Sequence, residues 1–224
     1  MFSLGNRLSL CGSFVRENAL LVDIGSDHGY LPVSLFKSGK VKIAIAADIG
    51  EGPLSYARKN AAKYSADVEC ILSDGFENIK PDSFTDAVIA GMGGELISTI
   101  ISKADYLKNP KYRLILQPMT AEPELRIWLA ENGFAIEEEK ACFDSGKIYT
   151  VMCVSYVGEE NSKISEVQIY LGKLNPQVEE SRKYAEKVVK RLSNRVFGAQ
   201  HREEFDEAEK LKSLINEIKE MYNI

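Results

Sequence analysis

The sequence predicts an α/β protein: a doubly wound, mostly parallel sheet with an antiparallel last strand, followed by a C-terminal helical hairpin of coiled-coil type. Two observations lead to this fold class. Between Leu20 and about Val157, short apolar runs alternate with amphipathic stretches, as strands and crossover helices do. Beyond Val157 the apolar residues recur at steps of three and four, the spacing of helices that bury one face.

Each element of the first region has a boundary signal. We expect strands at 20–22, 42–47, 68–72, 87–90 and 113–117, and helices at 31–38, 53–63, 95–103 and 122–132. Pro53 falls in the first turn of its helix, and Gly133 lies where a glycine ends a helix. The segments 134–140 and 148–156 flank a turn at 144–147, which predicts a hairpin. A parallel sheet that closes with a hairpin is typical of the Rossmann-like class I methyltransferases, whereas NAD domains keep an all-parallel sheet.

The remaining residues, 159–224, are predicted to form a second domain beside a first domain of residues 1–158. A short helix at 165–174 is followed by two longer apolar rows at 178–196 and 205–222. The two rows suit an antiparallel hairpin. Such a hairpin either packs on the first domain or on a second subunit, or serves as an arm that holds a large substrate.

The composition does not determine whether the protein binds nucleic acid. The net charge of −5 argues weakly against nucleic acid, but the charges are uneven along the chain. The stretch 182–202 is basic apart from Glu186, and acidic residues crowd the next stretch, 203–209. These charges form either a solvated helix balanced by its neighbour or a stripe that follows phosphates.

The sequence also carries expectations about compartment and metal. Its apolar runs are far too short for a membrane span, and its N-terminus lacks the pattern of a signal peptide. The four cysteines are scattered and only two histidines accompany them, so no zinc-ligand set can be written. We therefore expect a cytoplasmic protein with no metal and no membrane segment, and nothing indicates an obligate protein partner.

Acidic and glycine residues follow the ends of the first four predicted strands. In chain order these are Asp23 to Gly29, then Asp48, then Asp74-Gly75, then Gly91 to Gly94. In a doubly wound sheet such strand ends converge on one cleft. A carboxylate at the first end suits the ammonium and sulfonium of S-adenosylmethionine better than a pyrophosphate. The next two acids can accept hydrogen bonds from a ribose and an adenine amine, and the glycine turn leaves room for a flat base.

Two other readings of this cleft are disfavoured. A dinucleotide site needs the three glycines of G-x-G-x-x-G, and Asp27 takes the middle position, where it would repel a pyrophosphate. Methyltransferases of exocyclic amines carry Asn/Asp-Pro-Pro-Tyr/Phe after the fourth strand, whereas this chain has Ala90-Gly91-Met92-Gly93-Gly94. The target is therefore expected to be a ring nitrogen.

Asp27 and His28 are the candidate catalytic residues. Adenine N1 already carries a lone pair, so methylation there needs alignment and desolvation more than proton removal. Positive charge then develops on the ring, and Asp27 is expected to stabilise that charge or to hold the cofactor's ammonium. His28 is the alternative, either as a general base or as a loop residue that only hydrogen-bonds.

Four segments resemble the bacterial tRNA (adenine(22)-N(1))-methyltransferase family. They are Leu21 to Pro32, which includes Asp-His-Gly-Tyr-Leu-Pro, Ala90 to Gly94, Leu116-Gln117-Pro118, and Gly146-Lys147-Ile148-Tyr149. The resemblance covers nearly the whole chain. It implies methyl transfer from S-adenosylmethionine to N1 of an adenine in the D-arm of tRNA, with S-adenosylhomocysteine as the product. Residues 1–158 would then bind the cofactor, and the helical domain 159–224 would help to grip the tRNA.

The resemblance also indicates site residues. The cofactor would contact Asp23, Gly25, Ser26, Asp27, His28, Asp48, Ile49, Asp74, Gly75, Gly91 and Met92. Apart from the resemblance, the residues themselves suggest that the tRNA contacts Arg7, Gln117, Lys183, Lys187, Lys190 and Arg191. Arg7 lies in an amphipathic N-terminal segment predicted to cover the cleft, where it would pair with the cofactor carboxylate, a tRNA phosphate or a surface acid. Gln117 either reads a base edge or simply ends its strand.

Two residues differ from the family's usual pattern, and two other functions are alternatives. Many relatives have Ala in place of Gly29 and Asn in place of Met119, so no base-reading role is expected at Met119. The alternative functions are an S-adenosylmethionine-dependent methyltransferase of a small molecule or a protein, and a non-catalytic S-adenosylmethionine-binding protein.

Overall fold

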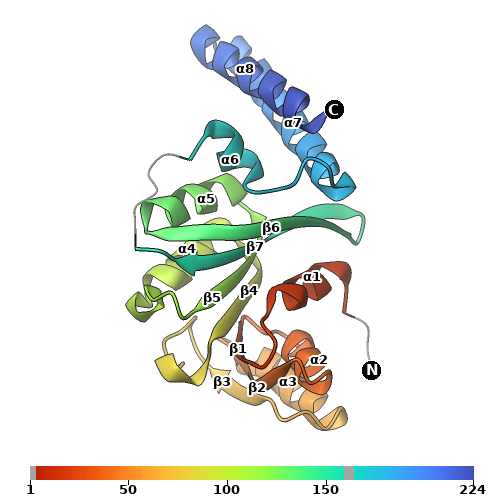
Figure 1. The fold of residues 1–224 in the computed structure, drawn as a ribbon, viewed down its shortest axis with the longest axis vertical. Helices are drawn as coiled ribbons and strands as arrows, with labels where there is room; N and C mark the ends of the chain where they lie inside the picture. Colours follow the sequence, from red (N-terminus) through yellow and green to blue (C-terminus); the bar gives the residue numbers. More distant parts are fainter. Residues whose placement is uncertain (1–3, 159–163) are drawn as a thin grey trace.

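A seven-stranded sheet forms the centre of the computed structural model, which describes residues 4–158 and 164–224 (Figure 1). Its strands are β1 Ala19–Ile24, β2 Val41–Asp48, β3 Glu69–Leu72, β4 Asp86–Gly93, β5 Arg113–Thr120, β6 Phe134–Asp144 and β7 Lys147–Tyr156. They lie in the order β3-β2-β1-β4-β5-β7-β6. The first five run parallel, and β7 pairs antiparallel with both β5 and β6. The predicted fold class, including the antiparallel last strand, is confirmed.

Helices cover both faces of this sheet, so its central strands are apolar on both sides. The helices are α1 Asn6–Phe14, α2 Tyr30–Lys37, α3 Glu51–Lys63, α4 Gly94–Ser102, α5 Glu122–Glu131, α6 Glu166–Leu171, α7 Glu179–His201 and α8 Phe205–Tyr222. In β1, Val22 packs in the core under α4 and α5, while its neighbour Leu21 packs on the other face with α1 and α2. Both side chains are fully buried, each worth about 1.5–3 kcal/mol.

Two strand ends differ from the sequence-based expectation. The sequence predicts a turn at Gly91–Gly94, but β4 continues to Gly93 with irregular pairing around Met92, and Gly94 begins α4. Likewise β5 continues past Gln117 to Thr120 and contains Pro118. This proline is tolerated because β7 pairs with β5 only as far as Leu116, so β5 has a neighbouring strand on one side only beyond that point.

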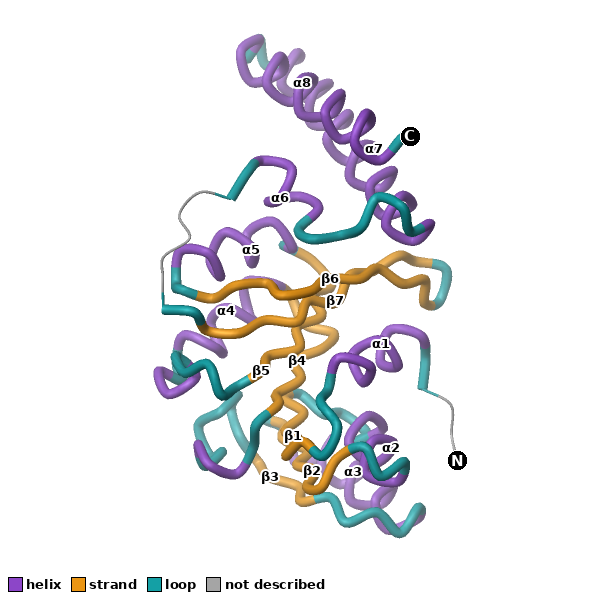
Figure 2. The backbone as a smooth tube through the Cα atoms, in the orientation of Figure 1, coloured by secondary structure: helices purple, strands orange, loops and turns teal. Residues whose placement is uncertain are grey.

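The C-terminal helices form the predicted hairpin, which projects at the end of the molecule far from β3 (Figure 2). α7 and α8 pack through one apolar cluster that includes Val188, Leu192 and Ile218. The same cluster takes in Ile148 of β7 and Leu171 of α6, so the base of the hairpin is continuous with the sheet domain. The predicted domain boundary falls at residues 158 and 159, and residues 159–163 lie outside the described part of the chain.

A buried ion pair holds this junction together. Arg126 of α5 and Glu139 of β6 approach to 2.6 Å, and both side chains are almost fully buried. Arg126 also donates to the carbonyls of Ile169 and Tyr170 in α6, and the backbone N–H of Lys173 donates to Glu139. One carboxylate and one guanidinium therefore join α5 and β6 to the more distant α6 and the residues that follow it.

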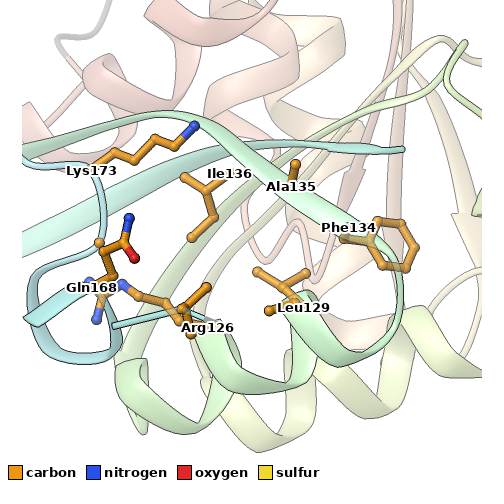
Figure 3. Close-up of a pocket in the computed structure, with 10 residues that line it drawn as sticks. Arg126, Leu129, Phe134, Ala135, Ile136, Gln168 and Lys173 are labelled. Atoms are coloured by element: carbon orange, nitrogen blue, oxygen red, sulfur yellow. The ribbon is translucent and has the colours of Figure 1, made fainter. Parts of the chain in front are cut away.

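A cavity of about 240 Å³ adjoins this ion pair (Figure 3). Its apolar wall includes Leu129, Phe134 and Ile136, and Arg126 and Gln168 lie at its polar end. Because Glu139 neutralises Arg126, the cavity offers that guanidinium to no anionic ligand. It contains none of the predicted site residues, and we regard it as a packing feature of the junction.

Candidate active site

The carboxyl ends of β1 and β4 open into a cleft of about 410 Å³. The residues that line it are Arg7, Leu8, Asp23, Gly25, Ser26, Asp27, His28, Gly29, Tyr30, Leu31, Ala90 and Gly91. Seven of these, Arg7, Asp23, Gly25, Ser26, Asp27, His28 and Gly91, are residues that the sequence predicts for the site. The α1 residues Arg7 and Leu8 show that the N-terminal helix covers the cleft, as the sequence suggests.

The loop after β1 requires glycine at Gly25. Its φ of +74° belongs to the left-handed region, and a Cβ added there would overlap Cε of Met92 in β4. The backbone N–H groups of Gly25 and Ser26 both donate to the carbonyl of Ala47 in β2, at 2.8 and 3.0 Å. The loop therefore packs between β2 and β4, the strands on either side of β1, and its backbone forms one wall of the cleft.

Asp23 is a buried acid at the base of this loop. It is 7 % exposed, and the hydroxyl of Ser26 donates to its carboxylate at 2.5 Å. Burial raises the pKa of Asp23 to about 7, although the Ser26 hydrogen bond lowers it; Asp48 raises it further and Arg7 lowers it. Near neutral pH the carboxyl group therefore titrates, and a cationic ligand would favour its ionised form.

Arg7 is held over the cleft by Gln117. The Arg7 guanidinium donates to Gln117 Oε1 at 2.5 Å, and the backbone N–H of Gly91 donates to the same oxygen at 3.0 Å. The other end of the Gln117 amide donates to the carbonyl of Pro118, and the side chain is fully buried. Gln117 therefore lies behind Arg7 and does not line the cleft, so contact of its amide with a base edge stays a prediction.

His28 and Asp27 lie together at the mouth of the cleft. His28 Nε2 is 3.3 Å from Asp27 Oδ2, and the Asp27 side chain is 69 % exposed. The His28 ring stacks on the Tyr30 ring, with their centroids 5.3 Å apart. The centroid of the Tyr56 ring, from α3, lies 5.0 Å from that of His28. Neither tyrosine is among the site residues that the sequence predicts. Tyr30 lies within the Asp-His-Gly-Tyr-Leu-Pro segment, whereas no spacing in the sequence connects Tyr56 with His28.

The predicted ribose and adenine ligands lie beside this cleft and do not line it. Asp48 accepts the backbone N–H of Gly50 at 2.8 Å, and Ile49 is 73 % exposed. Asp74 pairs with Lys103 at 3.1 Å and lines a separate cavity of about 510 Å³. The neighbouring Gly75 packs against α4, where a Cβ would come within 2.9 Å of the Ile100 side chain. The contacts of these residues, and of Met92, with a cofactor stay predictions.

The basic stretch of α7 is largely paired within the chain. Lys187 and Arg191 lie 3.6 and 3.4 Å from the buried Glu122 of α5, and Lys183 pairs with Glu186 at 3.0 Å. Lys190 is exposed and has no ionic partner among the described residues. Lys187 and Arg191 thus face a buried acid of another helix, as the interpretation of a balanced helix expects. Lys183 pairs only with an exposed acid of its own helix, and Lys190 with no described acid.

Two further features bear on the class of site. Within residues 4–158 and 164–224, no three His, Cys, Asp or Glu side chains are grouped as the ligands of a metal ion would be. No described helix combines the length and the apolar character needed to cross a membrane.

Comparisons with known proteins identify the family of the chain. Residues 4–152 match the family model of the methyltransferase domain. A tRNA (adenine(22)-N(1))-methyltransferase of Bacillus subtilis is 32 % identical over 173 residues, which cover 76 % of this chain and 72 % of that protein.

Solved structures extend the similarity to nearly the full length. A Streptococcus pneumoniae protein assigned to the tRNA (m1A22) methyltransferases, in complex with S-adenosyl-L-methionine, is 32 % identical with a TM-score of 0.82, over 99 % of this chain and 100 % of that one. The Bacillus subtilis m1A22 tRNA methyltransferase TrmK is 26 % identical with a TM-score of 0.85, again over 99 % and 100 %. The chain therefore belongs to the tRNA (adenine(22)-N(1))-methyltransferase family of methyltransferase-domain proteins.

Proposed function

We propose that the protein transfers a methyl group from S-adenosylmethionine to N1 of adenine 22 in the D-arm of tRNA. The observation that carries this proposal is the acidic, glycine-walled cleft at the ends of β1 and β4. It lies in a chain that shares its family with m1A22 methyltransferases. Activity on tRNA would place the protein in the cytoplasm.

The residues of the cleft fit a cationic cofactor. Asp23 and Asp27 supply carboxylates, and Gly25 and Gly91 have positive φ and present bare backbone. A Cβ at Gly91 would lie 3.4 Å from the Arg7 guanidinium, so the glycine leaves the space that Arg7 occupies. In our proposal Asp23 faces the cofactor's ammonium and sulfonium, and the exposed Asp27 faces the base that is methylated. Arg7 holds its carboxylate, while Asp48, Ile49, Asp74 and Gly75 extend the site towards ribose and adenine.

Methylation of adenine N1 does not require a general base. When bound, S-adenosylmethionine supplies an electrophilic methyl group. The N1 lone pair of adenine needs no deprotonation, so the main tasks of the protein are alignment and exclusion of water. Asp27, beside His28 at the mouth of the cleft, is placed to offset the positive charge that forms on the adenine ring. His28 then acts by positioning Asp27.

The helical hairpin supplies the proposed tRNA surface. Lys183 and Lys190 are exposed and make no ion pair to another helix among the described residues, while Lys187 and Arg191 secure α7 to Glu122. Phosphate contacts from exposed lysines add affinity that falls with salt. We therefore assign direct phosphate contact to Lys183 and Lys190, and a supporting role to Lys187 and Arg191.

One assay separates this function from its alternatives. The purified protein is incubated with methyl-labelled S-adenosylmethionine and bulk bacterial tRNA, and the tRNA is then digested to nucleosides. We expect the label in 1-methyladenosine, and none when a transcript with guanosine at position 22 is the substrate. Tight cofactor binding with no label in tRNA would favour a non-catalytic binder, or an enzyme that methylates a small molecule or a protein.

A further inference from the structure

We propose that Tyr30 is the surface on which the target adenine stacks once it has left the tRNA helix. The inference rests on the proposed function, because it concerns how that substrate is held. N1 lies on the Watson–Crick edge of adenine, so an enzyme must take the base out of its stack to reach this atom. With that edge directed at the methyl group, the two faces of the ring remain as the surfaces by which a protein can grip the base.

Among the described residues, three aromatic rings are in contact at the mouth of the cleft, and we call them the ring row. The His28 ring contacts both Tyr30, on which it stacks, and Tyr56, to which it is tilted, with centroid separations of 5.3 and 5.0 Å. Tyr30 is 40 % and Tyr56 is 52 % exposed, although large aromatic side chains usually bury most of their surface. Of the two tyrosines, only Tyr30 lines the cofactor cleft. It is therefore the ring that reaches both the cleft and the solvent from which a base would arrive.

The backbone holds this row in place. Gly29 has a φ of +66°, and a Cβ there would come within 2.9 Å of Ala57 Cβ, so the loop packs directly on α3. Asn60 of α3 also donates to the carbonyl of His28 at 2.8 Å. This close contact brings Tyr56 of α3 beside His28 in the loop, where α2 begins next to α3 (Figure 1). A preformed stack loses little side-chain freedom when a base adds to it.

Charge at the same place suits the product of the reaction. Asp27 Oδ2 lies 3.3 Å from His28 Nε2, so the acid is adjacent to the ring row. An adenine stacked on Tyr30 would place its ring beside this exposed carboxylate as methylation makes the ring cationic. The row and the acid thus form one subsite for the base, distinct from the buried Asp23 and the glycine wall that face the cofactor.

A substitution series at Tyr30 tests the stacking surface. Tyr30→Phe keeps an aromatic face, Tyr30→Leu keeps apolar bulk without one, and Tyr30→Ala removes both. We expect kcat/KM for tRNA to fall about 10- to 100-fold in the Leu and Ala variants, as stacking on one ring predicts, and the Phe variant to keep most of it. The Kd for S-adenosylmethionine, measured by calorimetry, should stay within about twofold in all three, which also shows that the variants are folded.

A fluorescent tRNA gives a second readout. With 2-aminopurine at position 22, stacking on an aromatic ring quenches the probe, so the bound complex should be dimmer with the native protein and Tyr30→Phe than with Tyr30→Leu. Equal activity of the Leu and Phe variants would overturn the proposal. So would cofactor affinity that falls in step with activity, because Tyr30 would then contact the cofactor. If the native protein forms no 1-methyladenosine, the proposed function itself fails.

Discussion

Arg191 of α7 reaches the carboxylate of Glu122 in α5, with 3.4 Å between Nη1 and Oε2, and so ties the helical hairpin to the sheet domain. Lys187 joins them at 3.6 Å. Glu122 directly follows Ala121, whose carbonyl lies so close to Gly94 that any Cβ there would overlap it. The hairpin is therefore connected, through one buried acid, to the end of β4 that borders the cofactor cleft.

Removing the charge of Glu122 should loosen this connection. We expect Glu122→Gln to raise KM for tRNA several-fold and to leave the Kd for S-adenosylmethionine unchanged. The free energy of unfolding, from urea denaturation, should fall by about 1–2 kcal/mol because two cations lose a buried partner. The matched control is Glu207→Gln, which breaks the exposed pair with Arg195 and should cost no more than about 0.5 kcal/mol. Equal losses in both variants would contradict the special role of Glu122.

The same carboxylate predicts an acid-dependent loss of stability. Burial opposes ionisation of Glu122, but backbone hydrogen bonding together with Lys187 and Arg191 brings its pKa below the ordinary 4.5. A depressed pKa stabilises the fold above about pH 4.5, and this contribution disappears as pH falls through the native pKa. The difference in unfolding free energy between the native protein and Glu122→Gln should therefore shrink below pH 4.5.

Lys183 and Lys190 should affect tRNA without affecting stability. We expect the double variant Lys183→Glu and Lys190→Glu to bind tRNA more weakly and with a shallower salt dependence, by about one unit of slope for each phosphate that a lysine no longer neutralises. Cofactor affinity should not change, and the urea midpoint should change only slightly, because both side chains are exposed and the Lys183–Glu186 pair lies at the surface. Filter binding at several salt concentrations is the measurement. Unchanged tRNA affinity would show that this face of α7 serves another purpose.

Asp23 predicts a pH dependence of cofactor binding. Its native pKa of about 7 lies above the ordinary 3.8, so its contribution to folding stability is complete below pH 3.8 and is lost as pH rises towards 7. A cationic cofactor selects the ionised form, so its affinity should rise about tenfold from pH 6 to pH 8. Calorimetry in buffers of different ionisation enthalpy should detect proton release at pH 6. Any pH dependence that persists in Asp23→Asn belongs to another group.

Asp27 should matter more to turnover than His28. We expect Asp27→Ala to lower kcat about 100-fold, because the charge that offsets the methylated ring is gone, and His28→Ala to lower it about tenfold because Asp27 is then less well positioned. Single-turnover kinetics with saturating tRNA measures both. The pH profile of His28→Ala should keep its shape if no proton is removed. A larger loss at His28, with a changed profile, would make the histidine the general base.

Gly25 and Gly39 form a matched pair of positive-φ glycines. Their φ values are +74° and +76°, but a Cβ at Gly39 meets nothing within 4 Å, whereas one at Gly25 overlaps Met92. Gly39→Ala should cost about 1 kcal/mol for the backbone alone, and Gly25→Ala about 1–3 kcal/mol more, with loss of cofactor binding. Adding Met92→Ala to Gly25→Ala should recover part of that difference. Equal costs at both glycines would rule out the packing explanation.

Contacts between residues far apart in the chain could not be predicted from the sequence, and the reason is the same for each. Arg7 and Gln117, Glu122 and Arg191, and Tyr56 and His28 are all far apart in the chain. Each contact depends on which helix packs on which strand end and on the rotamers that this packing allows. The orientation of Gln117 is the clearest case. Its place near the end of a strand suggested access to a base, but burial turned its amide towards Arg7 and Gly91.

By itself, the sequence determined the α/β alternation, the closing hairpin, the helical arm and the acidic loop of Asp23 to Gly29. These features follow from periodic burial and from the conformations that glycine and proline allow, which act over a few residues. Only the tertiary structure decided which cations of α7 pair with a buried acid of another helix, where the strand-end acids lie relative to the cleft, and that a row of aromatic rings borders it. Such choices depend on the packing of segments many residues apart, where charge pairing and close contact select one arrangement.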